Sequence, residues 1–165
     1  MYPELIDLLT SHMLEPQDRD SIAREVAAAP ENPEYEWARG DAAMAISCEL
    51  LNGLGDFAAT SDKIDELHEQ IQDMFEDSFP EFPAAALATG TGGRIDLTAY
   101  FAWLDQELAQ RGVEQGGYEA VIFDTGMDDN MSVFVVDRND TGRIVELAGA
   151  LGLRIDRPAH YLRMP

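Results

Sequence analysis

The sequence predicts an α+β protein whose N-terminal half is helical and whose C-terminal half holds a small antiparallel sheet. Apolar residues recur at helical spacing through the first 82 residues. Two β-rich runs, 118–123 and 131–136, come later and are separated by a loop of turn-forming residues. We therefore expect four helices, a fifth helix, the sheet and a C-terminal helix, all in a single domain that covers residues 1–165.

The four N-terminal helices are placed by their apolar spacing and by the residues that start or stop them. Pro3 lies near the start of the first helix, and Pro30 ends the second. Ser61 is the expected N-cap of the fourth. The predicted helices carry Leu5, Leu8, Leu9 and Met13, then cover residues 20–29, 36–51 (interrupted in pattern by Gly40, closed by Asn52-Gly53) and 61–79.

A connector rich in Pro, Ala and Gly, residues 79–93, offers a subdivision of the chain into an acidic helical half, 1–82, and an α/β half, 94–165. The fifth helix starts near Asp96 or Thr98. After the two strands, a turn at 139–142 precedes the last helix, which Gly152 ends. Residues 153–155 are expected to return as a short strand.

The chain carries a large excess of negative charge: 32 acidic against 11 basic residues, a net charge of -21. Residues 1–82 hold 20 acidic and 4 basic residues, and therefore most of that excess. Nucleic acid and anionic membrane are excluded as expected partners, because both require positive charge on the protein. The natural complement is a basic protein.

The best-ordered part of this charge lies on the predicted helix 61–79. At about 100° per residue, its acids fall on one face and its apolar residues on the other. Like charges four residues apart destabilise a helix by a few tenths of a kcal/mol per pair. The face is either a solvated outer surface or a docking surface for a basic protein. The residues chosen for the docking role are Glu66, Glu69, Asp73 and Glu76, with Asp128 and Asp129 as a second patch.

The segment Val121-Ile-Phe-Asp124-Thr-Gly126 resembles the way in which aspartic proteases present a catalytic carboxylate. That mechanism needs two carboxylates that share a proton, and the chain has one such motif. Only 39 residues follow Gly126, and they do not have the pattern of a retroviral-type protease. We therefore interpret the motif as a turn, in which Asp124 accepts from its own backbone and Gly126 takes a positive φ. No enzymatic activity is predicted.

No resident metal or cofactor is predicted. Asp124, Asp128, Asp129 and Asn130 offer oxygen ligands, but they lack the EF-hand order. The three histidines have no Cys or His partner at zinc-ligand spacing, and residues 90–94 lack the Gly-Lys-Ser/Thr of a P-loop. The lone Cys48 and the N-terminal sequence, which lacks a signal-peptide pattern, predict a cytoplasmic protein.

Residues 118–153 place a strand, an acidic turn, a second strand and a helix ending in Leu-Gly-Leu in succession. In this they resemble the C-terminal part of small uncharacterised bacterial domains. In size, acidity and lack of a catalytic set, the whole chain resembles the immunity proteins that bacteria pair with polymorphic toxins. The second resemblance implies an inhibitor of a toxin, and it carries over no functional residue.

Three hypotheses follow. The first is an acidic cytoplasmic binding protein that neutralises a basic toxin or effector domain. The second is a DNA mimic that occupies a DNA-binding protein. The third is a salt-adapted globular domain whose acids hold water and which has no dedicated inhibitory role.

Overall fold

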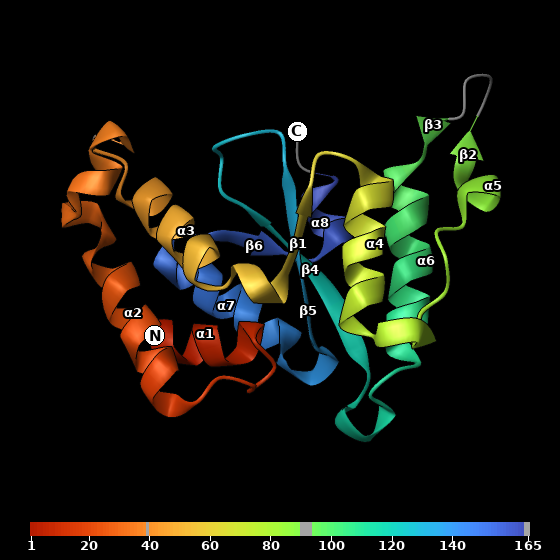
Figure 1. The fold of residues 1–165 in the computed structure, drawn as a ribbon, viewed down its shortest axis with the longest axis horizontal. Helices are drawn as coiled ribbons and strands as arrows, with labels where there is room; N and C mark the ends of the chain where they lie inside the picture. The colour runs from red at the N-terminus through yellow and green to blue at the C-terminus, as the bar shows by residue number, and fades with distance from the viewer. Residues whose placement is uncertain (39, 90–93, 164–165) are drawn as a thin grey trace.

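A four-stranded antiparallel sheet lies in the middle of the molecule, with helices on both of its faces (Figure 1). The computed structural model describes residues 1–38, 40–89 and 94–163. The strand order is β1-β5-β4-β6, so that β1 and β6 are the edge strands. The strands are β1 (Ala58–Ser61), β4 (Tyr118–Asp124), β5 (Met131–Asp137) and β6 (Arg154–Asp156).

One face of the sheet is covered by α1 (Tyr2–Leu9), α2 (Pro16–Ala28), α3 (Ala42–Gly53) and α7 (Thr141–Leu151). The other face is covered by α4 (Ile64–Met74) and α6 (Leu97–Ala109). Successive residues of β4 point to opposite faces, and five of its seven residues are buried. The two strands with continuous apolar runs therefore form the centre of the sheet, between two hydrophobic cores.

The remaining elements are short. They are η1 (Ala29–Glu31), η2 (Pro33–Ala38), η3 (Gly55–Phe57), η4 (Glu76–Ser78), η5 (Val113–Gln115), η6 (Arg138–Asp140), α5 (Ala84–Leu87), α8 (Pro158–Tyr161) and the hairpin strands β2 (Ala88–Thr89) and β3 (Arg94–Ile95). Among the described residues, no helix combines the length and the apolar content that a membrane span requires.

The predicted α+β class is confirmed, and the C-terminal elements agree with the sequence in detail. Strands β4 and β5 each extend the predicted run by one residue. The Asp96 side chain caps α6 by accepting from the backbone N–H groups of Thr98 and Ala99. Gly152 ends α7 with a φ of 73°, a left-handed conformation that favours glycine.

The predicted boundaries in the N-terminal half are partly wrong. Gly40 has a φ of 75° and divides the predicted helix 36–51 into η2 and α3, and the Asp41 side chain caps α3. The helix predicted for 61–79 covers only Ile64–Met74, because Ser61 belongs to β1 and Glu76 has a left-handed φ of 54°. The sequence does not predict strand β1, which occupies Ala58–Ser61.

Each of the two cores combines residues from both sides of the 79–93 connector. One core joins Leu5 of α1 to Val121 of β4, and the other joins Leu67 of α4 to Leu104 of α6. The described part of the connector follows η4 directly and contains α5 and β2. The predicted absence of a P-loop at 90–94 falls largely on residues 90–93, which lie outside the described residues.

Candidate functional site

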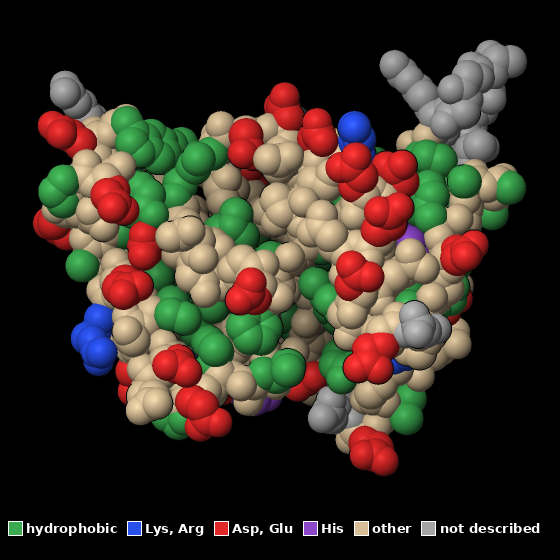
Figure 2. Space-filling view, viewed as in Figure 1, with side chains coloured by type: hydrophobic (Ala, Val, Ile, Leu, Met, Phe, Trp, Pro, Cys, Tyr) green, Lys and Arg blue, Asp and Glu red, His purple; other side chains and the backbone are tan. Residues whose placement is uncertain are grey.

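Helix α4 turns its acidic residues outward because its apolar residues are fixed in the core. Leu67 and Ile71 are fully buried against α6 and the sheet. Burying such a side chain contributes about 1.5–3 kcal/mol, which offsets repulsion among the acids. Figure 2 shows the acids as a column of red side chains over α4. This surface, here called the α4 acidic face, consists of the exposed residues Asp62, Asp65, Glu66, Glu69, Asp73 and Glu76.

His68 anchors the inner side of α4. Its Nε2 lies 2.9 Å from the carbonyl oxygen of Pro80, which can only accept, so Nε2 carries the proton. Its Nδ1 lies 2.8 Å from the Tyr100 hydroxyl, which donates to it. Burial lowers the pKa of His68, so the ring is neutral at neutral pH. No motif in the sequence predicts this role. The available signal is helical spacing, because His68 lies four residues after Ile64 and three before Ile71.

Gln70 fixes α4 to the edge of the sheet. Its Nε2 donates to the carbonyl oxygen of Thr60 (2.8 Å), and its Oε1 accepts from the N–H of Thr60 (2.8 Å). An edge strand leaves such backbone groups unpaired unless another element covers them. The paired amide contacts therefore close the free side of β1 and hold the acidic face in a defined position.

Few basic side chains of the protein neutralise the α4 acidic face. Of its described side chains, only Glu66 forms an ion pair, with Lys63 at 3.2 Å. Residues three or four apart on a helix lie about 6 Å apart, where two unit charges in water repel by about 0.7 kcal/mol. Several neighbouring acids of this face therefore repel one another, and a bound cationic partner would reduce that repulsion.

The second predicted patch lies on the loop that joins the two central strands, β4 and β5. Asp128 accepts from the backbone N–H of Asn130 (3.0 Å), so it shapes this loop, and both Asp128 and Asp129 are exposed. The loop ends at Met131, whose register partner in β1 is Ser61. Asp128 lines a hollow with Thr60 of β1 and with Cys48 of α3. The second patch therefore lies near β1 on the side of the sheet that α3 covers, whereas α4 covers the other side.

The Asp124-Thr-Gly segment has the predicted turn geometry. Asp124 Oδ1 accepts from the N–H of Gly126 (2.8 Å), and Gly126 has a φ of 76°. The other carboxylate oxygen forms an ion pair with Arg154. Both oxygens of Asp124 therefore hold the end of β4 in place.

One group of described residues has the composition of a metal site: His12, Asp137 and Asp140, whose potential ligand atoms all lie within 4.8 Å of one another. His12 Nδ1 lies 2.6 Å from Asp7 Oδ2, and its Nε2 lies 3.0 Å from Asp140 Oδ2. The hydrogen bond to Asp7, followed by that to Asp140, raises the pKa of His12. We therefore interpret the group as an ion-pair cluster around a protonated histidine.

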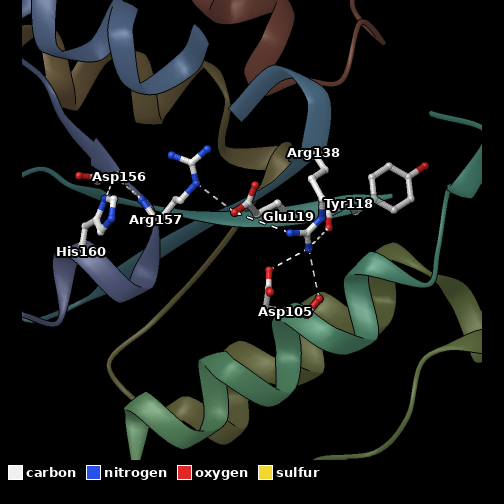
Figure 3. A network of polar contacts seen from close by, with 7 residues as sticks. All are labelled: Asp105, Tyr118, Glu119, Arg138, Asp156, Arg157 and His160. Carbon is white, nitrogen blue, oxygen red and sulfur yellow. Dashed lines mark hydrogen bonds and ion pairs between the residues drawn. The ribbon is translucent and has the colours of Figure 1, made fainter. Parts of the chain in front are cut away.

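A different arrangement surrounds β4 and β6, where acids are paired with arginines (Figure 3). Glu119, only 9% exposed, accepts from Arg157 Nε (3.2 Å) and lies 3.9 Å from Arg138 Nη1. Arg138 Nη2 also donates to Asp105 Oδ1 (2.8 Å). We call these four residues, Asp105, Glu119, Arg138 and Arg157, the paired network. It connects α6, β4, η6 and the end of β6.

The molecule is a three-layer protein, with an antiparallel sheet between two layers of helices and an acidic face on α4. No protein-family model matches the chain, and the searches of curated proteins and of solved structures give no match either.

Proposed function

We propose that this protein is an acidic binding protein that neutralises a basic protein, in the manner of an immunity protein that inhibits a bacterial toxin. The observation that carries the proposal is the α4 acidic face, in which six exposed acids meet one lysine. Glu66, Glu69, Asp73 and Glu76 are its proposed contact residues, and Asp128 and Asp129 form a second proposed patch.

The mechanism of neutralisation is occupation of a cationic surface. A toxin that acts on nucleic acid or nucleotides binds phosphate through Lys and Arg, and carboxylates on a rigid helix would compete for these side chains. Complementary charge at this density also raises the association rate. The proposed compartment is the cytoplasm, where the free thiol of Cys48 stays reduced.

The proposal is tested with a charge-reversed variant, Glu66→Lys/Glu69→Lys/Asp73→Lys. Wild type and variant serve as baits in extracts of the source cells, and the affinity of the captured basic protein is then measured at several salt concentrations. We expect the variant to bind about 100-fold more weakly, with a smaller salt dependence. Co-expression of the wild type, but not of the variant, should relieve the growth arrest that the partner causes. Equal binding and equal salt dependence of both baits would refute the proposal.

Partner capture and a melting experiment distinguish the other two hypotheses. A captured partner that binds DNA, and that the protein displaces from DNA, would support the DNA mimic instead. A salt-adapted domain would unfold when salt is removed, so its melting temperature would rise steeply with molar KCl. We expect the fold to persist at low salt, because its core is held by apolar contacts between the sheet and the helices on both faces.

A further inference from the structure

An open apolar groove lies beside the C-terminal end of α4. It has a volume of about 280 Å³ and is lined by residues of the α1–α2 loop, η3, α4 and the sheet. Figure 2 shows a hollow between α1 and α4, with hydrophobic side chains on one side and acidic ones on the other. A cavity of about 150 Å³ can hold a benzene ring, so this groove has room for at least one large apolar side chain.

The groove is open because two elements stop short of it. Strand β1 pairs with β5 only as far as the Ala58–Phe134 pair, so Val135 has no neighbour from β1. Helix α1 ends at Leu9, and the left-handed Ser11 and His12 turn the chain away. The Ser11 hydroxyl donates to the carbonyl oxygen of Val135 (3.4 Å), which fixes this wall of the groove.

Two methionines flank the groove and are exposed to an unusual degree: Met13 by 73% and Met74 by 38%. Methionine has an unbranched and polarizable side chain that adapts to different apolar partners. The groove also has an acidic margin. Asp56 lines it and is exposed, and Met74 itself follows Asp73 in the α4 acidic face. The groove thus combines an apolar centre with an acidic margin.

We infer that this groove receives an apolar side chain from a cationic amphipathic helix of the partner, whose basic side chains lie along the α4 acidic face. This inference rests on the proposed function and adds the chemistry of the partner segment. Charge complementarity selects the occupant, because a neutral or acidic helix would meet Asp56, Asp73 and Glu76 without compensation. Within α4, the acids Glu66, Glu69 and Asp73 follow the 3-4 spacing of one helix face, which a parallel row of Lys or Arg matches.

The test uses two synthetic peptides of about 15 residues, long enough to form a helix on binding. One contains Lys and Leu, with Leu at helical spacing; the other has Gln in place of every Leu and the same charge. We expect the wild type to bind the Leu peptide about tenfold more tightly than the Gln peptide, by isothermal titration. The Met13→Gln/Met74→Gln variant should lose this preference while its affinity for the Gln peptide stays unchanged.

A matched control is Leu97→Gln on α6, because Leu97 is 37% exposed and lies outside the groove. This control should keep the tenfold preference. Methyl NMR gives a second readout that needs no variant: the signals of Met13 and Met74 should shift with the Leu peptide, whereas Met1 should not. A preference that persists in the groove variant, or methyl signals that stay in place, would overturn the inference.

The outcomes separate the inference from the proposed function. If charge reversal on α4 weakens both peptides but the groove variant has no effect, the groove inference is wrong and the proposed function stands. If charge reversal leaves both affinities unchanged, the proposed function is wrong. If sedimentation shows a dimer of the protein that Met74→Gln dissociates, a second copy covers the groove and the inference is wrong.

Discussion

The α4 acidic face and the paired network use the same residue types in opposite ways. On α4, one lysine meets six exposed acids, whereas around β4 and β6 the acids Asp105 and Glu119 are held by Arg138 and Arg157 (Figures 2 and 3). Paired acids connect elements of the fold, and unpaired acids only repel one another. Net charge alone therefore does not distinguish the two regions, whereas the presence or absence of an arginine partner within the fold does.

The largest expected change in the free energy of unfolding comes from the buried side of α4. His68→Ala should lower the free energy of unfolding by about 3 kcal/mol, because it leaves a cavity and removes the partner of the Tyr100 hydroxyl. Its exposed neighbour Glu69→Ala should change it by less than about 0.5 kcal/mol. Urea unfolding of both variants measures this difference, and equal costs would show that the outer side of α4 also holds the fold.

A smaller loss is expected in the paired network. Glu119→Gln should cost about 1–3 kcal/mol, because it removes the charge that Arg157 and Arg138 face in a largely buried position. The matched change on the acidic face, Glu69→Gln, should cost nothing. Denaturant unfolding measures both, and a double-mutant cycle of Glu119→Gln with Arg157→Met isolates the pair. A coupling energy near zero would contradict the structural role of this network.

The His12 cluster gives a pH-dependent effect. Its raised pKa means that the folded protein binds this proton more tightly than the unfolded chain, in which a histidine has a pKa of about 6.5. The stabilisation is therefore complete below about pH 6.5 and is lost as the pH rises through the raised value. We expect His12→Gln to cost about 0.5–1 kcal/mol at about pH 6 and less at about pH 9. A cost that does not change with pH would contradict a protonated His12.

The smallest expected effect is a rise, and not a fall, in the free energy of unfolding. Glu69→Gln/Asp73→Asn removes like charges from the α4 acidic face, so it should raise the free energy of unfolding by up to about 0.5 kcal/mol at low salt. Salt screens these charges, so the gain should vanish at about 1 M NaCl. Thermal unfolding at both salt concentrations measures the gain. A loss of stability at low salt would mean that these acids have partners within the fold.

The sequence predicts the elements whose signals are local. Strands β4 and β5 have long apolar runs, and Asp96 and Gly152 mark helix ends through their own backbone neighbours. Strand β1 has only four residues, Ala-Ala-Thr-Ser, and no apolar run. It exists because it pairs with Met131–Phe134, about 70 residues later, and such a distant partner leaves no local signal.

The acidic side of α4 could be predicted for the same reason, since helical spacing alone places its acids together. The pairing of acids with arginines could not be predicted from the sequence. Glu4 and Arg143 are 139 residues apart, and Glu119 and Arg157 are 38 apart. Only the fold shows which acids have an arginine beside them. It is this information that separates the α4 acidic face from the paired network.

The most direct test asks whether the position of the charge matters, and not only its amount. Two variants change the net charge equally: Glu66→Gln/Glu69→Gln/Asp73→Asn on α4, and Glu25→Gln/Glu31→Gln/Glu34→Gln, three exposed acids of α2, η1 and η2. Both are titrated with the Lys- and Gln-containing peptide at low salt. We predict that the α4 variant binds about tenfold more weakly than the wild type and that the second variant changes by less than about twofold. Equal losses in the two variants would contradict the account, because bulk charge would then explain the binding.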